Sequence, residues 1–219
     1  MQEITYEITE KDRLKALAAA YKLAMISLRR GDPFPMVRFE WPELIITDPA
    51  ELEEFGKVID RPDNRDLRLD DFQVDAVRSV FDQKHTQVRI SGGTKLGKGL
   101  ITGGFIVNLW FDLYDDCKIV LVGPNTDHLK INMFGEAATW RRKMTSYKIG
   151  LNVPDVQKEK IEGAGKPTHV IKLANTDSGE GLSGNHSSAT LFIYDEASNA
   201  PDEYYMNSLS QCKMLVAVS

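Results

Sequence analysis

Apolar residues near the start of the chain recur every three or four positions. This spacing predicts an amphipathic helix from Thr9 to Arg30. Thr9 and Asp12 have the spacing of a capping box at its beginning, and Gly31 is suited to terminate it. The stretch from Gly31 to Pro62 is rich in proline and mixed charge, so we expect a mostly irregular connector with one short helix near residues 50–58.

From Asp70 onward, short apolar runs alternate with helical patterns. Strands are predicted at residues 87–91, 118–122, 169–173, 191–194 and 214–218. Helices are predicted at 72–81, 98–113 and 127–144, the first capped by Asp70 or Asp71. This alternation indicates a mainly parallel sheet covered on both faces, and right-handed crossovers then give a three-layer α/β sandwich. We therefore divide the chain into a helical and irregular accessory segment at 1–62 and an α/β domain at 63–219.

A glycine-rich segment follows the first predicted strand and fits the pattern G-x-x-x-x-G-K. Glycines let successive backbone N–H groups wrap a phosphate, and the next helix adds the positive end of its dipole. Lys98 would then reach the β- and γ-phosphates of ATP, and Lys95 could act on the γ-phosphate. The predicted ATP-binding residues of this loop are Gly92, Gly93, Thr94, Lys95, Leu96, Gly97, Lys98 and Gly99.

Gly99 departs from the usual pattern, which has Ser or Thr at this position. The missing hydroxyl would normally bind Mg²⁺. The metal is therefore left to water, to Asp195, or to Thr102 one turn further along the helix. An ordinary glycine-rich turn is the alternative for the whole loop, but the strand, turn and helix context favours a phosphate loop.

An apolar strand at 190–194 ends in Asp195 and Glu196, as a Walker B element does. Asp195 would hold Mg²⁺ through its water shell, and Glu196 would act as the general base for the attacking water. Such a strand alone often means only that a strand ends at the surface. Its position about 100 residues after a phosphate loop makes the catalytic interpretation stronger.

Three further features carry weaker predictions. Gln73 precedes the phosphate-loop strand and could read the adenine edge, although a surface glutamine is an equal alternative. Arg141 and Arg142 could form an arginine finger toward a neighbouring subunit, or simply be a solvated basic pair. His186 could connect nucleotide state to a moving loop, or be an exposed loop histidine.

From about Asp70 to Ser219 the chain resembles the ATPase domain of phage terminase large subunits. The resemblance is sharpest at Gly181-Leu-Ser-Gly-Asn-His186 and at the following Asp-Glu-Ala-Ser and Pro-Asp-Glu segments. It implies a P-loop NTPase fold of the ASCE or RecA-like type. In that family Lys98 would be the Walker A lysine, Asp195 the metal aspartate and Glu196 the catalytic glutamate. Ser219 would be the first residue of the coupling motif.

The resemblance also implies a function and a set of partners. The chain would hydrolyse ATP with Mg²⁺ to drive double-stranded DNA into a capsid. It would act with a capsid portal, a small terminase subunit and further copies of itself in a ring. The family's C-terminal nuclease is not in this chain, so we expect no nuclease activity here and a nuclease that is separate or missing.

Composition narrows these expectations. The net charge of −5 and the sequence pI of about 5.5 argue against a nucleic-acid coat protein, which would carry a basic excess. The two cysteines, Cys117 and Cys212, match no metal-binding spacing and are expected to be reduced thiols. No signal core and no apolar run of ~20 residues is present, so the host cytoplasm is the expected location.

Two alternatives remain open from the sequence. One is a helicase-like or recombination ATPase with the same core, which would need a second RecA-like domain. The other is a nucleotide-binding structural or regulatory protein that hydrolyses ATP poorly, because Gly99 offers no hydroxyl to the metal.

Overall fold

The computed structural model describes residues 9–58, 66–93, 96–151, 161, 169–175, 182 and 184–219. Within these ranges a five-stranded sheet with the order β1-β5-β4-β2-β3 forms the centre of the fold, and every pairing in it is parallel. The strands are β1 (Gln87–Ile90), β2 (Lys118–Gly123), β3 (Val170–Asn175), β4 (Leu191–Tyr194) and β5 (Met214–Val218). The predicted α/β class and its mainly parallel sheet are therefore confirmed.

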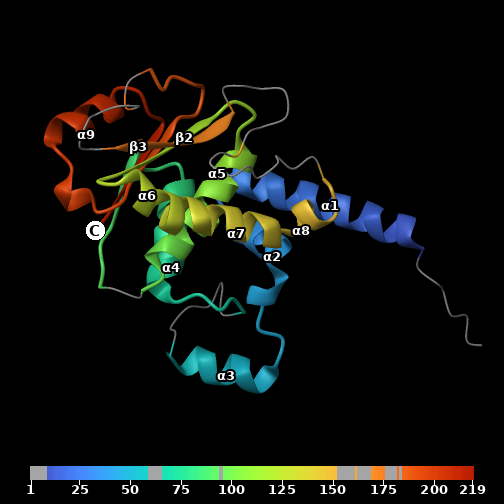
Figure 1. Ribbon diagram of the computed structural model, residues 1–219. Coiled ribbons are helices and arrows are strands. Elements are labelled where there is room, and N and C mark those ends of the chain that lie inside the picture. Colours follow the sequence, from blue (N-terminus) through green and yellow to red (C-terminus); the bar gives the residue numbers. More distant parts are fainter. Residues whose placement is uncertain are drawn as a thin grey trace, which may run out of the picture.

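Both faces of the sheet are covered, as the continuous apolar runs predict. Alternate strand residues belong to two separate clusters: Ile119 and Ile193 point into one, Val120 and Phe192 into the other. The first and larger cluster lies under α4 (Asp71–Phe81), α5 (Val107–Leu113) and α7 (Gly135–Lys143). The second lies under α9 (Asp202–Leu209), at the far side of the sheet from α4 and α7 (Figure 1).

Two of the predicted helices each contain a π-helical segment. The predicted helix at 98–113 includes η2 (Leu100–Ile106) before α5. The predicted helix at 127–144 consists of α6 (Thr126–Leu129), η3 (Lys130–Phe134) and α7. The two segments approach closely at Gly103, where an added Cβ would lie 2.6 Å from the Met133 carbonyl oxygen. Only glycine permits this crossing.

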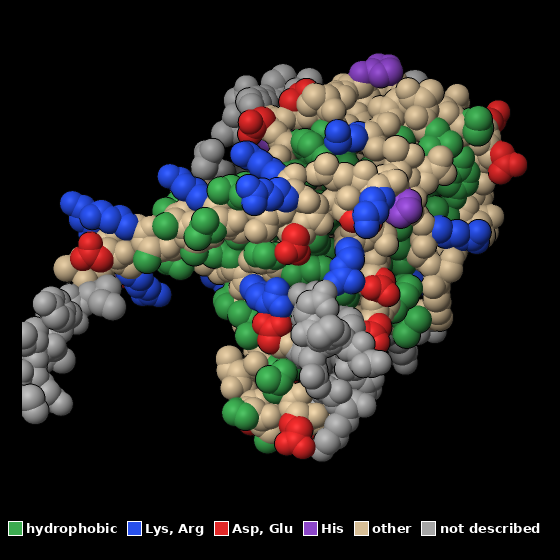
Figure 2. Space-filling view, turned by 180° about the vertical axis from the view of Figure 1, so that it is seen from behind, with side chains coloured by type: hydrophobic (Ala, Val, Ile, Leu, Met, Phe, Trp, Pro, Cys, Tyr) green, Lys and Arg blue, Asp and Glu red, His purple; other side chains and the backbone are tan. Residues whose placement is uncertain are grey.

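The N-terminal part begins with α1 (Glu10–Arg29), for which Thr9 is the N-cap as predicted. The Thr9 side chain accepts a hydrogen bond from the Asp12 N–H, and Gly31 ends the helix region with a φ of +92°. Much of α1 projects from the body of the molecule (Figure 1). Figure 2 shows hydrophobic side chains among Lys and Arg side chains along it, and Leu14, Leu23 and Ile26 are exposed there.

The prediction of a mostly irregular connector after Gly31 is wrong. This stretch contains α2 (Phe34–Glu40), η1 (Pro42–Leu44) and α3 (Pro49–Val58), of which only α3 was expected. Proline is compatible with the first turn of a helix, and α2 buries Phe34, Met36 and Val37 in the larger core cluster. Tertiary packing therefore supplies the helix that the local composition did not indicate.

The remaining short elements are α8 (Thr145–Lys148) and η4 (Ala197–Asn199). The predicted boundary between residues 62 and 63 lies outside the described residues. No helix in the described ranges combines the length and the apolar character that crossing a membrane requires. Cys117 is buried and Cys212 half-buried, and both are free thiols.

Candidate functional site

The phosphate loop predicted from the sequence lies where β1 ends. Thr94 and Lys95 are outside the described residues, so their predicted roles stay predictions. Gly97 has a φ of +71°, and a Cβ there would lie 2.7 Å from the Gln73 side-chain nitrogen. The positive φ favours glycine at this position, as in a loop that closes tightly on a phosphate, whereas the Gln73 side chain could move aside. A helical turn follows at once, beginning at Lys98.

The Lys98 side chain points back into the loop. Its Nζ donates to the carbonyl oxygen of Gly92 at 2.5 Å and to the main-chain oxygen of Ser219 at 2.9 Å. The hydroxyls of Ser91 and Ser219 also lie 3.0 Å apart. Ser219 follows β5, the neighbour of β1, so the residue predicted to begin the coupling motif lies against the predicted phosphate loop.

Asp195 lies across one cavity from Lys98. The cavity has a volume of about 420 Å³ and is lined by Gly97, Lys98, Gly99, Leu100, Thr102, Asn132, Met133, Glu136, Asp195 and Val218. Parallel strands place their carboxyl ends at one edge of a sheet, which is why the residues after β1 and β4 meet here. Burial raises the pKa of Asp195 above its usual range, and the nearby His128 opposes that shift.

His128 is a site residue that the sequence did not reveal. Its Nε2 lies 3.5 Å from the Asp195 carboxylate, and Asn132, one turn further along, contacts its ring. Asn125 caps α6 by accepting from the backbone N–H groups of Asp127 and His128. Because β2 pairs with β4, a helix that starts after β2 begins beside Asp195. The sequence signal that was available is Asn125, a helix N-cap residue just after the second predicted strand, which predicts that a helix containing His128 begins there.

Glu196 has a different orientation from Asp195. Its backbone is in the left-handed region, with φ 52° and ψ 44°, and its side chain is exposed. Its carboxylate accepts a long hydrogen bond of 3.5 Å from the Asn199 side chain. The described residues that line the cavity do not include Glu196. Its predicted role as general base stays a prediction and would need the side chain to turn toward the cavity.

Gly99 and Thr102 lie on the first turn after the loop. Gly99 has ordinary helical angles, φ −60° and ψ −40°, so its conformation does not require glycine. Thr102 is buried, and its hydroxyl donates to the Lys98 carbonyl oxygen at 2.8 Å. Thr102 lines the cavity as its predicted metal role requires, but its proton is committed to the helix backbone.

The Gln73 side chain joins the N-cap of α4 to the loop. Its side-chain oxygen accepts from the Asp70 N–H in a capping box, and its Nε2 lies 3.4 Å from the Leu96 carbonyl oxygen. This placement puts Gln73 beside the loop but does not test adenine recognition, which remains a prediction.

Arg141 corrects the prediction of a basic pair that faces a neighbouring subunit. Its side chain is fully buried, donates to the Asp112 carboxylate at 2.7 Å and lies over the Phe111 ring. A side chain held in this way can neither reach another subunit nor be solvated. Arg142 is exposed. His186 is also exposed and precedes β4, whereas Asp195 follows it, so the whole strand lies between them.

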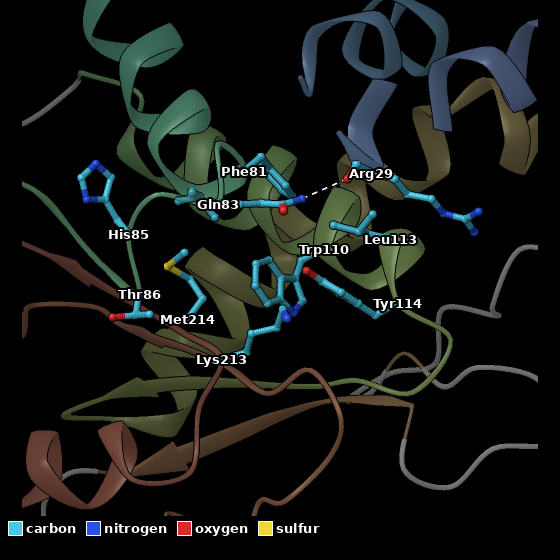
Figure 3. A pocket seen from close by; sticks show the side chains of 11 residues that line it. Arg29, Phe81, Gln83, His85, Thr86, Trp110, Leu113, Tyr114, Lys213 and Met214 are labelled. Atoms are coloured by element: carbon cyan, nitrogen blue, oxygen red, sulfur yellow. Dashed lines mark hydrogen bonds between the residues drawn. The ribbon is translucent and has the colours of Figure 1, made fainter. Parts of the chain in front are cut away.

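A second cavity, of about 560 Å³, lies at the other edge of the sheet, where β1 and β5 begin. Figure 3 shows Trp110, Tyr114, Lys213 and Met214 gathered around it. The Trp110 and Tyr114 ring centroids are 4.9 Å apart. None of the residues that line this cavity belongs to the predicted phosphate loop or to the Asp195 turn, so we place the candidate site at the carboxyl edge.

The residues at that edge fit a magnesium nucleotide. The cavity combines one lysine, a helix N-terminus and a partly buried carboxylate, which are the groups that bind phosphate and Mg²⁺ in P-loop proteins. The Asp195 carboxylate is partly buried beside His128, and a divalent cation in the cavity would offset its charge.

No protein-family model matches the sequence. No curated protein matches it either. Among solved structures, one crystal form of the large terminase from a thermophilic bacteriophage matches with a TM-score of 0.48 and 12% identity, over 68% of this chain and 38% of that chain. The same terminase in complex with ADP matches with a TM-score of 0.44 and 15% identity, again over 68% and 38% of the two chains. The matched part spans well under half of each terminase chain.

Proposed function

We propose that this chain binds and hydrolyses ATP at the carboxyl edge of its sheet. The observation that carries the proposal is the shared cavity of Lys98, at the end of a loop of P-loop pattern, and Asp195, at the end of β4. The β5 strand lies between β1 and β4, so the two groups face each other across one intervening strand. This spacing leaves room for the phosphates between them.

Each side chain has a role that its position supports. The loop amides and the N-terminus of the following helix would bind the phosphates. Lys98 would exchange the carbonyl oxygens of Gly92 and Ser219 for phosphate oxygens. Asp195 would bind the hydrated metal, and Glu196 would accept the proton of the attacking water. Mg²⁺, when bound, supplies positive charge that neutralises the phosphate oxygens.

The finer proposal is the motor domain of a viral DNA-packaging terminase. The support is the motif set of the sequence: the glycine-rich segment that ends at His186, then Asp195-Glu196-Ala-Ser, then Pro201-Asp-Glu203. In this role the chain would move double-stranded DNA through a capsid portal in the host cytoplasm. A small terminase subunit, further copies in a ring and a nuclease outside this chain would be its partners.

The test is ATP turnover by the purified chain with Mg²⁺, measured alone, with double-stranded DNA, and with DNA and portal. We expect slow turnover alone and stimulation by DNA with portal. Absence of both ATP binding and turnover under all three conditions would contradict the proposal. Stimulation by single-stranded DNA, with none from the portal, would favour a helicase-like or recombination ATPase instead.

A second candidate is a nucleotide-binding protein with weak hydrolysis. Two observations favour it: Gly99 carries no metal-binding hydroxyl, and Glu196 is turned out of the cavity. Tight ATP binding without turnover in the presence of DNA and portal would support this candidate over the motor.

A further inference from the structure

Glu136 of α7 faces the position where the usual hydroxyl is missing. A Cβ added at Gly99 would meet the Glu136 Cγ at 3.9 Å, an ordinary van der Waals contact. A side chain at position 99 would therefore touch the Glu136 side chain. Glu136 lines the same cavity as Lys98 and Asp195.

The fold holds Glu136 there by two independent contacts. Gly103, one turn after Gly99, lets η3 and α7 approach, because any Cβ at 103 would lie 2.6 Å from the Met133 carbonyl oxygen and 3.1 Å from the Glu136 Cβ. The Trp140 indole N–H then donates to the Glu136 carboxylate at 3.0 Å. Trp140 is itself fixed by edge contacts with Trp41 and Phe105.

The chemistry of Mg²⁺ fits this arrangement. Proteins bind nucleotide-linked Mg²⁺ through one or two carboxylates, with phosphate oxygens and waters completing the octahedral shell. Within the described residues no group of three or more His, Cys, Asp or Glu side chains could hold a metal by itself. Asp195 and Glu136 could hold a metal only together with the phosphates of a nucleotide.

We propose that Glu136 is a metal ligand that replaces the hydroxyl absent at Gly99, so that Glu136 and Asp195 together hold the nucleotide-bound divalent cation. This inference rests on the proposed function, because it needs a nucleotide at the phosphate loop. The ligand of the site would then be the metal–nucleotide complex and not the free nucleotide.

The proposal predicts that Glu136 has opposite effects on nucleotide affinity without and with a divalent metal. Without metal, the Glu136 carboxylate repels the phosphates and weakens nucleotide binding. With Mg²⁺, the same carboxylate attracts the cation and strengthens it. Glu136→Gln removes the charge but keeps an oxygen that can accept from Trp140. The variant should therefore bind metal-free nucleotide as tightly as wild type or more tightly, and gain less affinity from Mg²⁺.

The experiment titrates a fluorescent ADP analogue into wild type and Glu136→Gln, with either Mg²⁺ or EDTA. The ratio of the two affinities measures the Mg²⁺ increment. We expect the increment to fall roughly tenfold or more in the variant, the scale of loss when a metal site is disturbed. Electron paramagnetic resonance with Mn²⁺ and ADP should show a matching loss of tightly bound Mn²⁺.

Three further variants sharpen the result. Gly99→Thr combined with Glu136→Gln should restore part of the increment, since the space at 99 admits a side chain. Trp140→Phe removes the N–H that positions Glu136 and should reduce the increment less than Glu136→Gln. Glu54→Gln, at an exposed position on α3, is the matched control and should leave the increment unchanged. Thermal unfolding establishes that each variant is folded.

Equal losses with Mg²⁺ and with EDTA would make Glu136 a structural residue and overturn the proposal. An unchanged increment with slower ATP turnover would make it a base instead, which also overturns it. In either case weaker nucleotide binding by Lys98→Ala would support the proposed nucleotide site independently of Glu136. If Lys98→Ala has no effect and wild type does not bind nucleotide, both proposals fall.

Discussion

The Glu40 carboxylate accepts hydrogen bonds from both the backbone N–H and the hydroxyl of Ser146, at 3.0 and 2.9 Å. The pair joins α2 to α8, and neither side chain reaches solvent. Burial raises the pKa of Glu40 to about 7, and Asp112 adds to the shift, whereas Ser146 and Arg141 oppose it. With Glu40 protonated, the charges of Arg141 and Asp112 balance each other.

Glu40 should make stability depend on pH. Its pKa is higher in the folded chain than the ordinary value of 4.5, so the folded state holds the proton more tightly. The resulting stabilisation is complete below pH 4.5 and is lost as pH rises to about 7. Glu40→Gln should remove this loss and stabilise the protein at pH 8, relative to wild type, by up to about 3 kcal/mol. Urea unfolding at pH 5 and pH 8 measures it.

The comparison between variants isolates this residue. The Arg38 side chain lowers the pKa of Asp66, which gives a contribution of opposite slope, but that contribution is the same in both proteins and cancels in the difference. If the gap in unfolding free energy between Glu40→Gln and wild type is equal at the two pH values, Glu40 is already ionised in the folded chain.

Arg141→Met should destabilise the fold strongly. The buried guanidinium pairs with Asp112 and also donates to the Asn108 side chain. Its removal leaves a nearly buried carboxylate without its partner, which costs on the order of 3–5 kcal/mol. Arg142→Met changes an exposed neighbour on the same helix and should cost within about 0.5 kcal/mol. Similar denaturation midpoints for the two variants would refute the structural role of Arg141.

Lys98→Ala should weaken nucleotide binding. The lysine would form a charge-assisted hydrogen bond to phosphate, and the loss of such a bond corresponds to roughly tenfold to a hundredfold in affinity. Titration with a fluorescent ATP analogue measures the change, and Lys22→Ala on the exposed side of α1 is the control. ATP turnover at the wild-type rate in Lys98→Ala would mean that the nucleotide site is not at this loop.

Glu196→Gln should slow hydrolysis without loss of nucleotide affinity. A general base contributes on the order of 10²–10⁴-fold to the rate, while the loop amides and Lys98 carry binding. Rate and affinity are to be measured on one preparation, with Glu54→Gln as the control for an exposed carboxylate outside the site. An unchanged rate would mean that Glu196 keeps its outward orientation throughout the cycle and that another group activates the water.

The sheet and the glycine turn after β1 could be predicted because their causes are local. Buried parallel strands must be continuously apolar, and the predicted bounds of 191–194 and 214–218 agree with β4 and β5. Gly97 has a positive φ, which favours glycine, so this turn can be recognised in the sequence from the glycine itself. The meeting of Lys98 and Asp195 then follows from the parallel order of the strands.

The features that escaped prediction depend on contacts between distant segments. Arg141 is buried because Asp112 lies opposite it, 29 positions earlier in the chain. Glu136 reaches the loop because Gly103 lets two helices approach, and the sequence does not state which helices touch. A basic pair and a helical glutamate are usually solvated, so the local pattern gave no reason to select either residue.

The hydrogen bond from Lys98 to Ser219 couples the end of β5 to binding at the proposed site. In the proposed nucleotide complex Lys98 would exchange the Ser219 oxygen for a phosphate oxygen, so the filled and empty loops would differ in how firmly residue 219 is held. Linkage is reciprocal. If bound nucleotide changes the equilibrium for release of this segment by some factor, release of the segment changes nucleotide affinity by the same factor. A mechanical force on residue 219 would therefore change the dissociation constant for ATP, because Lys98 bonds either to the Ser219 oxygen or to the nucleotide.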